Sequence, residues 1–164
     1  MTASIRKALK TDAAAIWSIL EPIIRDGETY PLPRDMSRED AIAYWLSDAH
    51  QTFVAVNADE ISGTYYIRAN YAGGGAHIAN CGYVVGEKAR GQGIARAMCT
   101  HSIEFAKQLG FKAIQFNFVV ATNTSAIALW TSCGFETLCR LPGVFDHPRE
   151  GLVDALVMFK QLDT

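Results

Sequence analysis

The sequence has no long apolar run and no excess of charge of one sign. No stretch reaches the ~18 apolar residues of a membrane-spanning helix, and no apolar segment near the N-terminus is typical of a secretion signal. The formal net charge at pH 7 is −2, with acidic and basic residues scattered, so neither nucleic acid nor an anionic membrane is an expected partner. We therefore expect a cytoplasmic protein whose partner is a small molecule.

The cysteines also lack a recognisable pattern. They do not have Cys-x-x-Cys spacing, and no histidine lies near them in the register of a metal site. They are Cys81, Cys99, Cys133 and Cys139. Buried, reduced thiols are therefore favoured over a disulfide framework or a zinc site, and no metal is expected.

The length and composition are those of one domain. Of the 164 residues, 49% are hydrophobic, which is enough for a proper core and leaves little for a second domain. No linker or internal repeat interrupts the chain, so we predict a single domain over residues 1–164. The periodicity of its apolar residues by itself indicates a mixed α/β domain.

The apolar pattern predicts helices and strands in a definite order. Helical spacing follows a cap at residues 11–12, and Pro22 is expected to kink or shorten that helix. Residues 26–36 contain glycine and prolines and indicate a loop. The expected elements are a strand at 4–8, helices after residues 12 and 37, strands at 53–56 and 63–68 joined by a turn near 57–60, a strand at 78–85, a helix at 91–109, a strand at 112–120, a helix at 123–133, and a closing hairpin of strands at 135–141 and 152–159.

The most informative stretch is residues 83–95, where an apolar run meets a glycine-rich turn that opens a helical pattern. Gly91 and Gly93 remove side-chain bulk, so a ligand can approach backbone N–H groups that have no partner in a helix's first turn. Those groups and the positive end of the helix predict a phosphate site. Neither a P-loop nor a dinucleotide fingerprint fits, because Ile94 and Arg96 stand where the first needs lysine and the second a small residue.

Two blocks of residues resemble the signature of one superfamily. The first is Arg-x-x-Gly-x-Ala, which lies between an expected strand and an expected helix and consists of Arg90, Gly93 and Ala95. The second begins with an Asn-x-x-Ala-x-x-Leu segment and ends in Gly-Phe, and its matching residues are Asn123, Ala126, Leu129, Gly134 and Phe135. Together they resemble the acetyl-coenzyme A signature of the GCN5-related N-acetyltransferase (GNAT) superfamily. The resemblance implies an α/β fold of mixed type, with a mostly antiparallel sheet splayed between its fourth and fifth strands and flanked by helices.

The resemblance also implies an N-acetyltransferase that uses acetyl-coenzyme A (acetyl-CoA). The acetyl group would pass directly to a primary or secondary amine of a small molecule, for example an amino acid or an analogue. A backbone N–H near Val85 would polarise the thioester carbonyl, and the loop at 26–36 with the following helix would form a wall on the acceptor side. The residues expected at the cofactor are Tyr83, Val84, Val85, Arg90, Gly91, Gln92, Gly93, Ile94, Ala95, Asn123, Ser125 and Trp130.

The chain departs from the family at one position, because Trp130 stands where the family's usual tyrosine acts as general acid. An indole N–H can donate a hydrogen bond but cannot usefully transfer its proton near neutral pH. We therefore predict that the thiolate is protonated through water or leaves as an anion, with Asn123 as one hydrogen-bond donor to it. A packing role for the indole is the alternative to a polar one.

Asn80 and Asn117 lie inside apolar runs on the two strands that the family splays apart. One hypothesis is that they hold the acceptor or the carbonyl oxygen, and the other is that they make structural hydrogen bonds between backbone segments, since buried amides must be hydrogen-bonded. The run at 116–123 resembles the fungal acetyltransferases that act on proline analogues.

The general base is the least defined part of the mechanism. Glu28 and His77 are the first candidates, and solvation is the alternative for each. His147 and Asp154 are weaker choices, and a chain of water molecules to solvent would also serve. For a carboxylate on the acceptor, the candidates are Arg34 and Arg68, with plain surface placement as the alternative.

Other functions stay open on the sequence. The acceptor could be an amine of a protein or peptide. The domain could also be a non-catalytic sensor of acyl-CoA, which the replacement of the usual tyrosine favours, or a nucleotide-binding module, which lacks a Ser or Thr for Mg²⁺ directly after the turn. Both a monomer and a homodimer are compatible with the sequence.

Overall fold

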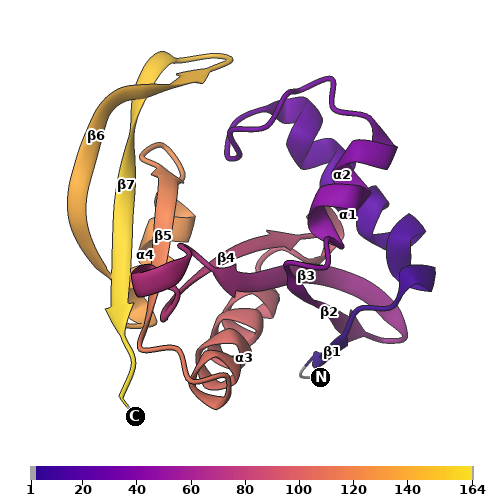
Figure 1. Cartoon of the computed structure of the whole chain (residues 1–164). Helices are drawn as coiled ribbons and strands as arrows, with labels where there is room; N and C mark the ends of the chain where they lie inside the picture. Colours follow the sequence, from indigo (N-terminus) through magenta and orange to yellow (C-terminus); the bar gives the residue numbers. More distant parts are fainter. Residues whose placement is uncertain (1–2, 164) are drawn as a thin grey trace.

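The computed structural model describes residues 3–163, and its strands form one seven-stranded sheet in the order β1-β2-β3-β4-β5-β7-β6 (Figure 1). The order of the main helices and strands along the chain confirms the predicted mixed α/β fold. Short 3-10 turns lie at η1 (Lys10–Asp12), η2 (Gly73–Gly75) and η3 (Glu87–Ala89). The main elements are β1 (Ser4–Lys7), α1 (Ala13–Asp26), α2 (Arg38–Trp45), β2 (Gln51–Asn57), β3 (Glu60–Ala69), β4 (Ile78–Val85), α3 (Ile94–Gln108), β5 (Ala113–Val120), α4 (Thr124–Ser132), β6 (Glu136–His147) and β7 (Gly151–Gln161).

The pairing of β4 with β5 is parallel and very short. It consists of Ile78 opposite Ala113 and Ala79 opposite Ile114, whereas the other neighbouring strands pair antiparallel. Beyond these residues the two strands diverge, and Figure 1 shows β5, β6 and β7 turning away from β1–β4. The expected splay between the fourth and fifth strands is therefore confirmed.

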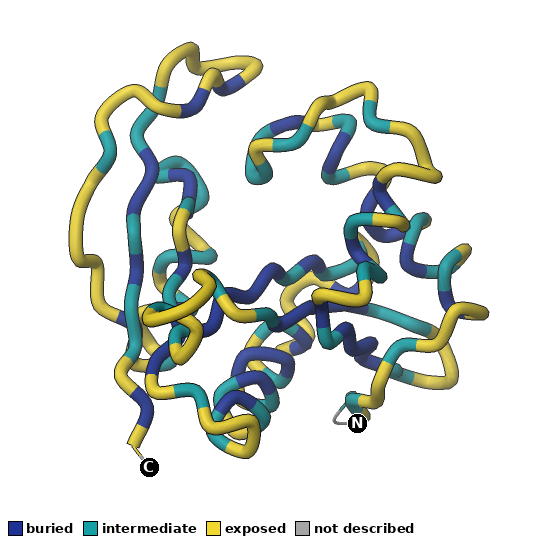
Figure 2. Tube along the Cα trace, in the orientation of Figure 1, coloured by how far each residue is buried: buried dark blue, intermediate teal, exposed yellow. Residues whose placement is uncertain are grey.

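Two hydrophobic clusters cover the two faces of the sheet, and β3 contributes alternate residues to each of them. Tyr65 and Ile67 pack with Met98 of α3 in one cluster, whereas Tyr66 packs with Trp45 of α2 in the other. Successive side chains of a strand point to opposite faces, so neighbouring residues of β3 serve different cores. In Figure 2 the buried residues accordingly concentrate along the central strands and on the inner sides of the helices.

Pro22 does not shorten α1, although this was one of its two expected effects. The helix continues past it to Asp26 and ends at Gly27, which has a left-handed φ of 66°. An interior proline costs about 3 kcal/mol. Burial of Ile19, Leu20 and Ile24 against the sheet offsets this cost, because each such side chain contributes roughly 1.5–3 kcal/mol when fully buried.

The closing hairpin is longer than its predicted strands. β6 continues through Pro142 and Gly143 to His147, so residues 142–147 are strand rather than loop. β6 is the edge strand of the sheet, where a proline without an N–H can be accommodated. A register shift between Leu141 and Phe145 marks the irregularity that these residues introduce.

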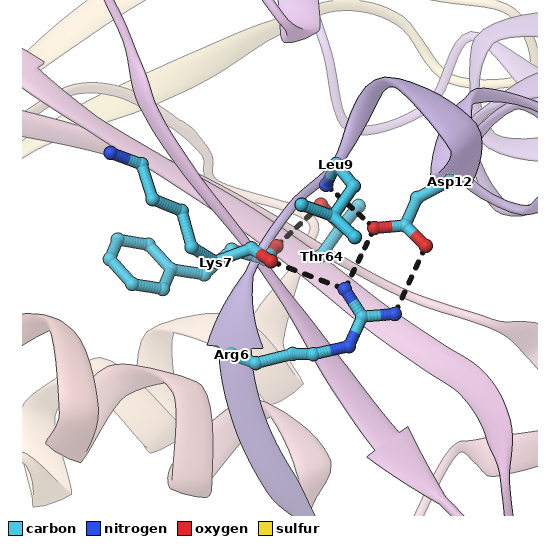
Figure 3. A network of polar contacts seen from close by, with 6 residues as sticks. Arg6, Lys7, Leu9, Asp12 and Thr64 are labelled. Carbon is cyan, nitrogen blue, oxygen red and sulfur yellow. Dashed lines mark hydrogen bonds and ion pairs between the residues drawn. The ribbon is translucent and has the colours of Figure 1, made fainter.

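A polar network holds β1 to the start of α1 (Figure 3). The two terminal nitrogens of Arg6 donate to the two carboxylate oxygens of Asp12 at 2.8 and 3.0 Å. The backbone N–H of Leu9 donates to the same carboxylate at 2.7 Å. The Arg6 guanidinium is the main reason that the pKa of Asp12 lies below its usual value. The carboxylate therefore favours the folded state when it is ionised.

We expect Asp12→Ala to lower the free energy of unfolding at pH 7 by about 1–2 kcal/mol, because both the ion pair and the hydrogen bond to the chain are lost. The difference from the parent should be complete above pH ~3.9, the carboxyl's unfolded pKa, and should shrink as the pH falls through the lower folded value. Urea unfolding at several pH values measures it, with the exposed Asp163→Ala as control. An equal change in the free energy of unfolding for both substitutions would contradict the stabilising role of the Asp12 carboxylate.

Candidate active site

The opening between β4 and β5 is one side of a cleft of about 1040 Å³. Its walls come from segments far apart in the sequence. They include the loop after α1, parts of α2 and β3, the edge of β4, the first turn of α3, the diverging part of β5, α4 and the turn between β6 and β7. The cleft thus joins the glycine-rich turn to the second block of the sequence signature.

The glycine-rich turn presents unpaired backbone to this cleft. Gly91 and Gly93 have φ angles of 76° and 78°, a left-handed conformation that favours glycine. The first helical hydrogen bond of α3 is made by Ala97, so the N–H groups of its first turn have no partner within the helix. A Cβ at either glycine would meet nothing within 4 Å. This open space beside free N–H groups fits an anion.

The edge of β4 presents a second set of backbone groups. The N–H of Gly86 donates to Ser62 on the β3 side. Backbone groups of a strand alternate in direction, so those of Val85 and Tyr83 point the other way, toward the cleft. The hydroxyl of Tyr30 reaches the same edge and donates to the Tyr83 carbonyl at 2.9 Å. The N–H of Val85 is therefore available to a ligand.

The residues predicted at the cofactor line the cleft with one exception. Gln92 lies outside the lining, where its side chain donates to the Lys88 carbonyl and accepts from Asn57. Those that line it are Tyr83, Val84, Val85, Arg90, Gly91, Gly93, Ile94, Ala95, Asn123, Ser125 and Trp130.

Trp130 forms part of the cleft wall and packs against aromatic rings. Its ring centroid lies 4.8 Å from that of Tyr83 and 5.1 Å from that of Phe116, and the residue is 9% exposed. The Tyr83 hydroxyl is bonded to Ser102 at 2.7 Å, and burial raises its pKa well above the usual value. Neither side chain is therefore placed as an acid for a leaving thiolate.

Both candidate asparagines line the cleft, and both also make hydrogen bonds within the protein. Asn80 donates to the carbonyl of Gln115 at 2.9 Å, at the point where β4 and β5 separate. Asn117 and Asn70 exchange two hydrogen bonds, at 2.6 and 3.0 Å. These contacts support the structural interpretation, and Asn80 in particular replaces a backbone bond that the diverging strands no longer make.

Glu28 lies in the cleft wall and is paired with Arg149 at 2.6 Å. The pair joins the loop after α1 to the turn between β6 and β7, across the mouth of the cleft. Glu28 is 29% exposed at its side chain and remains reachable by a ligand. It therefore stays a candidate for the base that takes a proton from an ammonium group.

The other candidate bases differ in position. His77 lies outside the lining of the cleft. His147 lines it, is 5% exposed and accepts a hydrogen bond from the backbone N–H of Arg149. Asp154 lies outside the lining of the cleft. Its carboxylate accepts a hydrogen bond from Arg140, which lowers the pKa of Asp154 from the usual value.

Sequence reasoning did not single out the tyrosines of the acceptor side. Tyr30, Tyr44 and Tyr66 line the cleft, and the last two share a hydrogen bond of 3.0 Å between their hydroxyls. Burial raises the pKa of Tyr30 and of Tyr66 above the usual value, so both hydroxyls stay protonated at neutral pH. Their contacts join residues many positions apart, so no local pattern could have identified them.

Residues 15–135 match the profile of the acetyltransferase (GNAT) family. The chain belongs to this family. An N-acetyltransferase of Schizosaccharomyces pombe, aca1, is 31% identical over 156 residues, which cover 82% of this chain and 72% of that protein. The predicted family and enzyme class are therefore confirmed.

Solved structures agree with this assignment. A GCN5-related N-acetyltransferase from Kribbella flavida has a TM-score of 0.94 and 38% identity, with 98% of each chain covered. The fold is also that of yncA, a putative acetyltransferase from Salmonella typhimurium solved with acetyl-CoA, with a TM-score of 0.87, 21% identity, and 100% of this chain and 96% of that chain covered. No helix within residues 3–163 is long and apolar enough to span a membrane.

Asn80→Ala should lower the free energy of unfolding by about 1–2 kcal/mol, because the Gln115 carbonyl loses its donor where the strands part. Urea denaturation measures the change, with Asn57→Ala, which removes an exposed side-chain hydrogen bond, as the control. Unchanged stability together with a large loss of turnover would instead give Asn80 a direct role in the reaction.

Proposed function

We propose that this protein transfers the acetyl group of acetyl-CoA to a primary or secondary amine of a small molecule. The observation that carries the proposal is the meeting, in one cleft, of the free edge of β4 with the N-terminus of α3. The edge of β4 presents hydrogen-bond partners for an amide-containing arm, and the N-terminus of α3 suits a diphosphate. The acceptor side of the same cleft carries acidic, amide and phenolic groups.

The donor is acetyl-CoA, as predicted. Acetyl-CoA is bound in the structure of yncA, whose fold this chain shares. In this chain the N–H groups after Gly91 and Gly93 would hold the diphosphate, with Arg90 beside them. The Tyr83 N–H and the Val85 carbonyl, on the same edge of β4, would pair with the pantetheine amides. The donor supplies an activated acetyl group.

The Val85 N–H is the donor to the thioester oxygen in this proposal. It points into the cleft from a strand edge that β3 holds in place on its other side. A fixed donor aimed at a developing oxyanion contributes on the order of 2.7–4 kcal/mol to the stability of the transition state. Because it belongs to the backbone, substitution of Val85 would leave it in place.

Proton transfer is shared between solvent and the cleft wall. Glu28 takes the proton of the incoming ammonium, directly or through water, while the nearby Arg149 keeps the carboxylate in its place. The amine then attacks the carbonyl carbon, the bond between carbon and sulfur breaks, and the nitrogen loses a second proton to water. The departing thiolate takes a proton from water or leaves as an anion. Asn123 accepts a bond from the Ala126 N–H with its oxygen, which leaves its amide N–H groups for the departing thiolate.

The choice of a small amine over a protein amine rests on charge. A net charge of −2, with acidic residues scattered along the sequence, is no large excess that would favour a highly basic polypeptide. An amine of a protein or peptide is the second candidate, and it shares the donor chemistry. A cytoplasmic location and a homodimer complete the proposal.

Release of free thiol from acetyl-CoA tests the proposal, with amino acids, their analogues, polyamines and aminoglycosides as separate acceptors.

Gly93→Ala should raise the KM for acetyl-CoA at least tenfold, because the added methyl group enters the space of the diphosphate. Gly110→Ala is the matched control, since Gly110 also has a left-handed φ and open space but lies at the other end of α3. Thiol release with basic peptides alone would favour the protein amine, and acetyl-CoA binding without release would favour a sensor.

Trp130→Phe should keep most of the turnover, within about threefold, and should lower the free energy of unfolding by about 1–3 kcal/mol through lost ring contacts. Steady-state kinetics and thermal unfolding measure the two effects on the same preparation. A folded variant that lost most of its turnover would show that the indole N–H takes part in the reaction.

A further inference from the structure

Arg68 is a charged residue of the cleft that the acetyl donor does not use. It lies near the end of β3, directly opposite Asn80 of β4, and it lines the cleft. Directly opposed residues of an antiparallel pair project from the same face of the sheet. That face also carries Tyr66 and is the one covered by α1 and α2, so Arg68 lies on the acceptor side.

The guanidinium of Arg68 lacks a partner within residues 3–163. Its Nε is buried and has no hydrogen bond, and none of the ion pairs of these residues includes Arg68. A buried donor of a charged group without a partner costs more than an ordinary unmade hydrogen bond. Such a group is retained in a binding cleft when a ligand supplies the missing acceptor.

The two rings that sense the charge of Arg68, those of His50 and Tyr66, carry no negative charge. Burial is the main reason that the pKa of His50 lies below its usual value, and the charge of Arg68 lowers it further. His50 is thus neutral at pH 7, and it stacks on the protonated Tyr66 with ring centroids 4.2 Å apart. The guanidinium therefore faces the cleft beside neutral rings.

The other arginines near the cleft or considered for this role are engaged elsewhere. Arg149 is paired with Glu28, and Arg96 donates to Ser132 of α4. Arg34, the other sequence candidate for an acceptor carboxylate, lies outside the lining and donates its Nε–H to the Arg25 carbonyl. Arg90 belongs to the glycine-rich turn at the opposite end of the cleft wall.

We propose that Arg68 binds a carboxylate of the acceptor, so that the substrate class is an amino acid or a compact amino-carboxylic acid rather than a simple amine. The inference rests on the proposed transfer to a small amine and adds the residue that selects among such amines. A guanidinium offers a planar fork of N–H donors that matches the two oxygens of a carboxylate. Arg68 would hold the acid end while the amine faces the edge of β4.

Matched acceptors separate this role from the reaction itself. Proline, methionine and alanine are each assayed for thiol release beside their α-carboxamides and the amines that lack the α-carboxyl group. The parent protein should acetylate the acids with a kcat/KM on the order of 10- to 100-fold above that for the matched neutral compounds. The carboxamides are the stringent comparison, because their amines are less basic and more often unprotonated.

Arg68→Gln should remove that preference. Its kcat/KM should fall by the same 10- to 100-fold for the acids and stay unchanged for the carboxamides and amines, with the KM for acetyl-CoA also unchanged. Arg68→Lys keeps the positive charge but loses the planar pair of N–H donors. Its kcat/KM for the acids should lie between those of the parent and of Arg68→Gln. Arg140→Gln is the control, since Arg140 lies outside the cleft in an exposed pair with Asp154.

The outcomes distinguish the inference from the function on which it rests. Equal rates for acids and neutral compounds in the parent would overturn the role of Arg68 and leave the acetyl transfer intact. An equal loss for all acceptors in Arg68→Gln and Arg68→Lys, with thermal unfolding unchanged, would also overturn it. The absence of thiol release with every compound, while acetyl-CoA binds, would overturn the proposed function itself.

Discussion

The early end of the pairing between β4 and β5 is the constraint on which the site depends. A parallel ladder that continued would occupy the backbone groups of β4 and leave no room for a ligand. Here the ladder stops after Ala79 and Ile114, and the side chain of Asn80 takes the place of the next backbone bond. The unpaired edge that follows is both the opening of the cleft and a template for an amide-containing ligand.

The rest of the fold keeps this opening in place. One cluster packs α3 against the sheet beneath the glycine-rich turn, and the other packs α1 and α2 above the acceptor side. β3 contributes alternate residues to both clusters and holds the far edge of β4. The pair of Glu28 and Arg149 then joins the two sides of the cleft at its mouth. The binding groups on loops are therefore held in place by packed strands and helices. Such support matters because a small shift of a binding group lowers the rate of a catalysed reaction.

Local chemistry carried much of the prediction. The strand before Gly86 and the helix after Gly93 were predictable because strong periodicity meets glycine at both ends. The hairpin turn near Asp59 was predictable because a short polar stretch separates two β-rich runs. Two boundaries differed from expectation: α1 was not shortened at Pro22, and β6 continued through Pro142 beyond the predicted end at residue 141. In α1 burial against the sheet outweighs the proline, and in β6 the edge position makes its missing N–H harmless.

By itself the sequence determined the family, the order of the elements and the end of the cleft that suits a diphosphate, because these depend on residues close together along the chain. The tertiary structure alone decided which distant groups meet at the acceptor side. It gave Asn80 a backbone partner, paired Glu28 with a residue of the last hairpin, and left the Nε of Arg68 buried without a partner. Such pairings follow from strand register and helix packing, which bring together residues that no local pattern relates.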